Sequence, residues 1–181
     1  MCFHSKTNID GIKLLQVNVF NDERGYFFES YHYETLKKNG IVDIFVQDNQ
    51  SSSKKNVIRG LHFQIPPYAQ AKLVRVVQGS ALDVAVDLRK NSLTYGKHFS
   101  VVLSGNNQLQ LYIPVGFAHG FAALEEDTIF AYKCSNYYHK KSERVILFND
   151  KDLDIDWNIA SPIVADKDLQ AISFKDFISP F

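Results

Sequence analysis

Short segments in which apolar and polar residues alternate recur along almost the whole chain, separated by glycine, asparagine and proline. Clear examples are residues 81–88, 97–103, 109–113, 117–124 and 129–135. Alternation with period two is typical of a strand that buries one face, and the intervening residues are typical of turns. About ten such strands with little helix can bury their apolar faces by packing two antiparallel sheets together.

Helical patterning is confined to two places. Residues 33–39, followed by Gly40, fit a short helix with a glycine stop, and either a short helix or an extended tail fits from residue 165 onward. No linker, repeat or low-complexity segment interrupts the chain. The sequence therefore predicts an all-β fold, a cupin-type double-sheet jelly roll or antiparallel barrel with short peripheral helices, as one domain over residues 1–181.

Composition argues against several classes of function. The 20 Lys and Arg residues balance the 20 Asp and Glu residues, which disfavours nonspecific nucleic-acid binding. No apolar run of about 18 residues occurs and no apolar segment follows Met1, so we expect a soluble cytoplasmic protein without membrane contact. Cys2 and Cys134 belong to no CxxC or metal motif, so we expect a terminal thiol and a small half-buried hydrophobe.

Residues 56–77 bring three basic side chains near one apolar region. Arg59, His62 and Lys72 lie on two predicted neighbouring strands. By alternation Arg59 falls on the opposite face from His62, unless a bulge at Gly60 turns it round. Three potential cations around an apolar pocket are costly to bury, so the pattern indicates that an anion binds among them.

Polar residues also occur within other predicted strands. Gln47 and Asn49 share one face of a strand that runs into a predicted solvated loop at residues 51–56. Two amides on one face could bind a ligand or could satisfy the backbone of a loop. Asp83 lies in the apolar segment 81–88 and should therefore find a partner.

A charged hairpin is predicted near the start of the chain. Residues 11–20 and 26–31 read as its strands, with turn residues between them. Its charged members include Arg24 and Glu29, and the simplest interpretation of both is a solvated position on a sheet edge.

The pattern disfavours a metal site and a nucleophile. Metal-binding cupins supply two histidines one residue apart, but here Gln64 stands two residues after His62 and His119 is alone in its segment. Lys72 would also repel a cation. No GxSxG elbow occurs and neither cysteine has an activating motif, so we predict neither a metal site nor nucleophilic catalysis.

General acid–base chemistry suits these side chains better. A histidine paired with a carboxylate can accept a proton near neutral pH. A tyrosine can return a proton from the other side of a substrate, and a lysine can stabilise an oxyanion. These three groups, a base, a proton donor and a cation, are what an enzyme needs to remove a proton beside a carbonyl and to return one on the opposite face, which inverts the carbon. Buried histidines and tyrosines are often purely structural, so the residue types alone do not decide.

Seven segments of the chain carry a family resemblance. In order they are FNDERGYFFES, FVQDNQSSSKKNVIRGLHFQ, AQAKLVRVVQG, LDVAVDLRKNS, IPVGFAHGF, YKCSNYY and ADKD. Together they resemble the dTDP-4-dehydrorhamnose 3,5-epimerase family, from about Phe20 to Asp168. The combination of RGLHFQ, AQAKLVRV and GFAHGF is highly specific.

The resemblance implies a cofactor-independent epimerase of a nucleotide-diphosphate-linked 4-keto-6-deoxy sugar, in rhamnose or heptose biosynthesis for capsule or lipopolysaccharide. It also implies a cupin jelly roll and a homodimer with shared N-terminal strands. By similarity, His62 oriented by Asp168 would remove the protons at carbons 3 and 5. Lys72 would stabilise the enolate oxygen, and Tyr132 would return a proton from the opposite face.

The same resemblance implies a substrate-binding set. His119, partnered by Asp83, would line the sugar pocket. Arg59 and, across the dimer, Arg24 would contact the diphosphate and the nucleotide. The further implied binding positions are Glu29, Gln47, Asn49, Glu143 and Lys167.

The resemblance leaves the nucleotide and the sugar open. Relatives act on dTDP-linked hexoses or GDP-linked heptoses, and others invert carbon 3 alone. A 3,4-ketoisomerase, which moves the ketone, is disfavoured by RGLHFQ and Tyr132. A noncatalytic sugar-binding cupin would keep ligand binding after His62→Ala, and the presence of the other three implied catalytic residues disfavours it.

Overall fold

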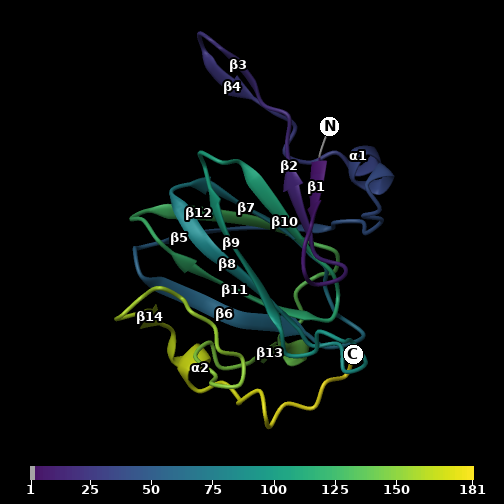
Figure 1. Ribbon diagram of the computed structural model, residues 1–181, viewed down its shortest axis with the longest axis vertical. Helices are drawn as coiled ribbons and strands as arrows, with labels where there is room; N and C mark the ends of the chain where they lie inside the picture. Colours follow the sequence, from purple (N-terminus) through teal and green to yellow (C-terminus); the bar gives the residue numbers. More distant parts are fainter. Residues whose placement is uncertain (1–2) are drawn as a thin grey trace.

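The computed structural model describes residues 3–181 and confirms the all-β prediction (Figure 1). One sheet has the strand order β1-β2-β10-β7-β12-β5, and the second has the order β13-β6-β11-β8-β9 with β14 beside β6. In chain order the elements are β1 Phe3–Lys6, β2 Lys13–Gln16, β3 Phe20–Asp22, β4 Gly25–Phe27, α1 Tyr33–Lys38, β5 Gln47–Ser53, β6 Val57–Gln64, β7 Lys72–Gln78, β8 Ser80–Asp87, β9 His98–Ser104, β10 Leu109–Ile113, β11 Phe117–Ala123, β12 Thr128–Cys134, the 3-10 helix Lys140–Ser142, β13 Glu143–Val145, β14 Ile163–Val164 and α2 Asp166–Leu169.

Three apolar clusters hold these layers together. The cluster between the two sheets includes Val74, Leu111 and Phe130. A second cluster lies between the outer face of β6, β8 and β11 and the C-terminal segment, which supplies Trp157 among others. A third packs α1 through Leu36 against the outer face of the first sheet. Strand β8 is buried along its whole length because both of its faces are covered.

Predicted and observed elements agree in the barrel and differ at its margins. The predicted helix at residues 33–39 is α1, one residue shorter. Strand β13 ends at Val145, and the chain then packs into the core as irregular backbone. The loop predicted at 51–56 was wrong in part, because residues 51–53 pair with β12.

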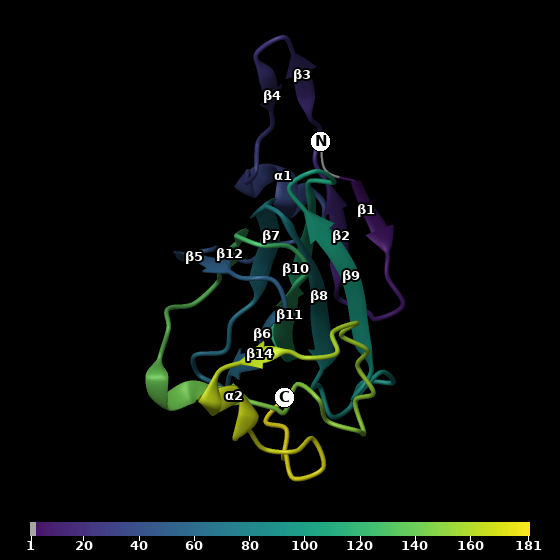
Figure 2. The ribbon, with the colours of Figure 1, turned by 90° about the vertical axis from the view of Figure 1, so that its left-hand side faces the viewer.

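The N-terminal hairpin is much shorter than predicted. Strand β2 stops at Gln16, and a separate pair of three-residue strands, β3 and β4, follows it. This pair projects away from both sheets (Figures 1 and 2), so no neighbouring strand extends it. The two α-helices described in residues 3–181 span six and four residues, and neither is long and apolar enough to cross a membrane.

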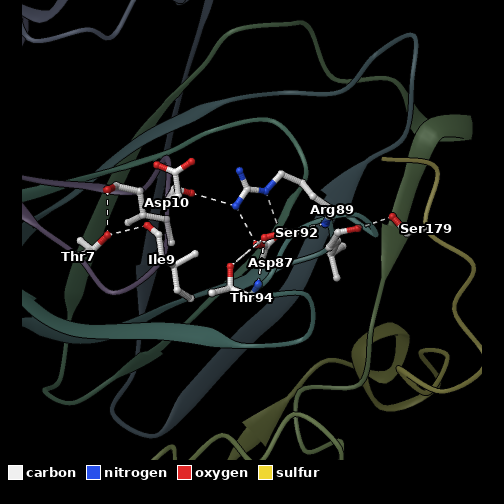
Figure 3. A network of polar contacts seen from close by, with 10 residues as sticks. Thr7, Ile9, Asp10, Asp87, Arg89, Ser92, Thr94 and Ser179 are labelled. Carbon is white, nitrogen blue, oxygen red and sulfur yellow. Dashed lines mark hydrogen bonds and ion pairs between the residues drawn. The ribbon is translucent and has the colours of Figure 1, made fainter.

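Polar contacts around the end of β8 hold segments near both ends of the chain, and a buried carboxylate is one of their centres (Figure 3). Asp87 is fully buried and accepts hydrogen bonds from Arg89 at 2.7 Å, Ser92 at 2.6 Å and Thr94 at 2.7 Å. Arg89 in turn donates to the carbonyl of Asp10 at 2.9 Å. Near the C-terminus the Ser179 hydroxyl donates to the carbonyl of Leu88. Burial raises the pKa of Asp87, but its hydrogen bonds outweigh burial and leave the pKa at about 2.

We expect Asp87→Asn to lower the free energy of unfolding near pH 7 by at least about 2 kcal/mol, the equivalent of a pKa lowered from its usual value to about 2. The native pKa is depressed, so this stabilisation is present above about pH 4 and disappears as the pH falls towards 2. Urea unfolding at several pH values should therefore show the difference between wild type and variant shrinking in acid. The exposed Asp154→Asn serves as a control, and a difference that does not change with pH would contradict the assignment.

Candidate active site

One cavity of about 310 Å³ opens between strands of the two sheets. Its walls come from β5, β7 and β12 of the first sheet and from β6 and β11 of the second. Ten of the residues predicted from the sequence line it: Gln47, Asn49, Arg59, His62, Lys72, His119, Tyr132, Glu143, Lys167 and Asp168.

A histidine and a buried carboxylate form the closest polar pair in this cavity. His62 Nε2 lies 2.7 Å from Asp168 Oδ1, and Asp168 is 2 % exposed. Burial raises the pKa of Asp168, but the hydrogen bonds with His62 and with the Gly60 N–H lower it by more. The net pKa therefore lies below its usual value. The ionised carboxylate can therefore hold one ring nitrogen of His62 while Nδ1 remains for a substrate proton.

Parallel pairing of β14 with β6 explains why residues so far apart in sequence meet. Ile163 lies opposite Val57 in this pairing, so the following helix α2 starts beside the middle of β6. Asp168 also accepts a hydrogen bond from the backbone N–H of Gly60 at 3.3 Å. The carboxylate is thus attached to the strand that carries its histidine, which fixes both groups.

A bulge at Gly60 allows Arg59 and His62 to face the same cavity. The pairing of β6 with β11 shifts register between His119 and Phe121, opposite this point. Gly60 has φ +148°, and a Cβ there would lie 2.6 Å from the Cα of Gly120. Only glycine fits such a conformation and such a close approach. The bend anticipated at Gly60 is confirmed.

A lysine and a tyrosine come from the wall opposite His62. Lys72 on β7 donates to the carbonyl of His62 at 3.2 Å, and burial lowers the pKa of its amine. Burial raises the pKa of Tyr132, which lies on β12. The imidazole of His62 and the phenol of Tyr132 approach the cavity from different sheets, so a molecule between them meets one on each side.

A second histidine–carboxylate pair lies deeper in the barrel. His119 Nε2 is 2.8 Å from Asp83 Oδ2, and His119 stands opposite His62 in the pairing of β11 with β6. Burial lowers the pKa of His119, and Asp83 opposes that shift only in part. A neutral His119 can therefore offer a hydrogen bond to a ligand without adding charge.

Polar side chains link the two sheets at the cavity mouth. Gln47 donates to Asn49 at 3.0 Å and accepts the backbone N–H of Tyr138 at 2.9 Å. Tyr138 donates to Glu143 at 3.2 Å, and Lys167 contacts the other oxygen of Glu143 at 3.2 Å. Of the two alternatives for the amides of β5, Gln47 shows loop support through Tyr138, and both amides line the cavity.

Three predicted residues do not line this cavity within one chain: Asp83, which pairs with His119, and Arg24 and Glu29, which lie farther away. The Arg24 side chain is 84 % exposed on the projecting hairpin and pairs with Asp22 at 2.5 Å. Glu29 is exposed and lines a separate cavity of about 90 Å³. In the single chain Arg24 is therefore solvated, as the simplest interpretation predicted. A contact with substrate across a dimer would need a second copy of the chain.

The described residues 3–181 contain no group of three or more His, Cys, Asp or Glu side chains that could hold a metal ion. Cys134 is 2 % exposed beside the cavity, and burial raises the pKa of its thiol. It is therefore more deeply buried than predicted. Cys2 lies outside the described residues.

Sequence reasoning missed Gln64 as a support of the cavity mouth. Its amide is 4 % exposed, donates to the carbonyls of Tyr68 at 2.6 Å and Tyr137 at 3.2 Å, and accepts the N–H of His139 at 2.6 Å. The rings of Tyr68 and His139 also stack, with centroids 3.9 Å apart. Alternation placed Gln64 on the face of His62, but no local signal shows that two distant loops meet there.

Comparisons with known proteins agree with this geometry. Residues 6–176 match the dTDP-4-dehydrorhamnose 3,5-epimerase family. The dTDP-4-dehydrorhamnose 3,5-epimerase of Salmonella typhimurium is 51% identical over 97% of this chain and 92% of its own length. A Legionella pneumophila epimerase solved with dTDP-4-keto-L-rhamnose superimposes with a TM-score of 0.95 at 43% identity, covering 98% and 95% of the two chains. A Bacillus anthracis relative solved with TDP and PPi has a TM-score of 0.94 at 45% identity, covering 96% and 99%.

We expect Gln64→Met to lower the free energy of unfolding by about 2–4 kcal/mol, because it leaves three backbone groups without their partner while keeping the side-chain length. Hydrogen exchange at residues 137–142 should rise with it. Denaturant unfolding and exchange mass spectrometry would measure both effects. Gln50→Met, at an exposed position on β5, is the control, and equal exchange in the two variants would contradict the role of Gln64.

Proposed function

Because the chain belongs to the dTDP-4-dehydrorhamnose 3,5-epimerase family, we propose that it inverts carbons 3 and 5 of a dTDP-linked 4-keto-6-deoxyhexose. Family membership supports an isomerase acting on a sugar nucleotide. One observation carries the proposal for this chain: a carboxylate-held histidine and a tyrosine line one cavity from opposite sheets. Inversion requires a base on one side of the substrate and a proton donor on the other.

The proposed reaction is a proton removal followed by a proton return at each carbon. The ketone at carbon 4 acidifies the protons at carbons 3 and 5. His62 takes the proton, and the electron pair moves into an enolate whose oxygen lies near Lys72. Tyr132 then gives its proton to the opposite face of the carbon. His62 releases its proton to solvent and the Tyr132 phenolate takes one up from solvent, so both groups are restored for the next carbon. Each cycle breaks one C–H bond and forms one, so no oxidant and no cofactor is needed.

Burial shifts the pKa values of Tyr132 and Lys72 in opposite directions. The raised pKa of Tyr132 keeps the phenol protonated near neutral pH, so it carries a proton to give. The lowered pKa of Lys72 makes its ammonium a stronger donor to an enolate oxygen than an exposed lysine would be. Asp168 stays ionised and stabilises His62 after that residue has taken up a proton.

The nucleotide part of the substrate is proposed from the cavity mouth and from the relatives. Arg59 and Lys167 are cations beside the cavity, where a diphosphate would meet them. The relatives are named for dTDP sugars, and the solved ones hold dTDP-4-keto-L-rhamnose or TDP. We therefore propose dTDP rather than GDP, and a hexose rather than a heptose.

A homodimer that shares its N-terminal segment is part of the proposal. The projecting hairpin exposes Phe20 by 64%, Tyr26 by 59% and Phe27 by 66%, which is costly for an isolated chain. Arg24 lies at its tip, between β3 and β4. A second copy that covers these rings would bring Arg24 to a neighbouring cavity, in keeping with its place in the binding set.

We expect NMR in heavy water to show deuterium entering carbons 3 and 5 of dTDP-4-keto-6-deoxyglucose, with loss of at least about a hundredfold in rate for His62→Asn because the base is gone. Tyr132→Phe should lose inversion while exchange through His62 continues. The GDP-linked sugar is the parallel control. Exchange at carbon 3 alone would establish a single-centre epimerase, and tight binding without any exchange would establish a sugar-binding protein.

We expect an equal mixture of Arg24→Ala and His62→Asn chains, refolded or expressed together, to recover about one quarter of wild-type activity, because random pairing forms one intact site in half of the dimers. Each variant alone should be nearly inactive. Steady-state turnover of the mixture measures the recovery. Arg24 acting within its own chain would give no recovery, and this outcome would contradict the shared hairpin.

A further inference from the structure

We propose that Ser53 is a positioning residue that aims the Arg59 guanidinium into the cavity without neutralising its charge. This inference rests on the proposed function, because it takes the diphosphate of a sugar nucleotide as the ligand of Arg59. Ser53 closes strand β5, is 3 % exposed and stands opposite Thr128 of β12. Its position is therefore set by the sheet before any ligand arrives.

Two neutral acceptors hold the Arg59 side chain. The Arg59 Nε–H donates to the Ser53 hydroxyl at 3.1 Å, and Nη2 donates to the carbonyl of Ser52 at 3.2 Å. A guanidinium has five N–H groups in a planar fork, so these two bonds fix its plane and leave the others for a ligand. Such a fork matches the paired oxygens of a phosphate.

Arg59 is held by neutral groups, unlike several other cations of the described residues. Arg89, Lys133 and Lys167 each lie within 4.0 Å of a carboxylate, whereas no such pair involves Arg59 among residues 3–181. A carboxylate would fix the guanidinium equally well but would cancel the charge that attracts an anion. A hydroxyl and a carbonyl orient it and leave that charge available.

Orientation matters because a long side chain loses rotamer freedom when a ligand immobilises it. A guanidinium that is already fixed avoids part of that loss, so it binds an anion more tightly than a mobile one. Removal of the Ser53 hydroxyl should therefore weaken binding through Arg59. It should leave proton transfer at His62 unchanged, because neither bond involves that residue.

The test compares dTDP with thymidine, which lacks both phosphates, by calorimetry. We expect Ser53→Ala to weaken dTDP about tenfold, the size expected for a hydrogen bond to a charged group, and to leave thymidine unchanged. KM for the sugar nucleotide should rise by a similar factor while kcat is retained. Ser53→Thr keeps the hydroxyl and should restore binding to within about twofold.

Two further variants separate positioning from a general loss of structure. In an Arg59→Met background, Ser53→Ala should have no further effect on dTDP, because the residue acts only through Arg59. Ser53→Asp should pair with Arg59 and weaken dTDP more than Ser53→Ala does, because it cancels the charge. Ser100→Ala, a matched change on the exposed part of β9, is the control.

Each outcome decides the inference. An unchanged KM in Ser53→Ala, or equal weakening of dTDP and thymidine, overturns it while the proposed function stands. If the effects of Ser53→Ala and Arg59→Met on the free energy of dTDP binding add fully in the double variant, the inference is also overturned. A wild-type chain that neither binds dTDP nor turns over the sugar nucleotide overturns both the proposed function and the inference.

Discussion

The site depends on the close approach of β6 and β11 at two facing glycines. A Cβ at Gly60 would meet the Cα of Gly120 at 2.6 Å, and a Cβ at Gly120 would meet the carbonyl of Arg59 at 2.9 Å. This contact allows the bulge that switches the faces of β6. Arg59 before the bulge and His62 after it both line the cavity. Leu61 lies in the apolar cluster between β6, β8, β11 and the C-terminal segment. The buried N–H of Gly60 in the bulge then donates to the Asp168 carboxylate.

Two of the cations that line the cavity are held by neutral groups, whereas Lys167 at its mouth pairs with Glu143. Lys72 donates to the carbonyl of His62, and Arg59 donates to a hydroxyl and a carbonyl. The carboxylates of the inner cavity are paired with histidines instead, through Asp83 and Asp168. An anionic diphosphate and a forming enolate would therefore meet cations whose charge is not already cancelled.

Local sequence predicted the strands of the barrel well and its margins poorly. Strand β10 was predicted with its observed bounds because it is bounded by turn residues and alternates cleanly. The N-terminal hairpin was overextended because alternation continues beyond Gln16, and nothing in the pattern shows that the chain leaves the sheet there. Residues 51–53 were assigned to a loop because serines are common in turns, yet pairing with β12 extends β5 through them. Both errors arise where tertiary pairing, rather than composition, decides the end of a strand.

The sequence by itself determined the fold class and the inventory of the site. Period-two alternation identifies strands because side chains of a strand point alternately to its two faces, and the RGLHFQ and GFAHGF segments carry the family resemblance. Only the tertiary structure decided which groups meet. His62 and Asp168 are 106 residues apart and are joined because β14 pairs with β6. The hydrogen bond from Arg59 to Ser53 likewise joins strands of different sheets. It forms only when the fold brings β5 and β6 within hydrogen-bond distance, which the pattern of neither strand shows.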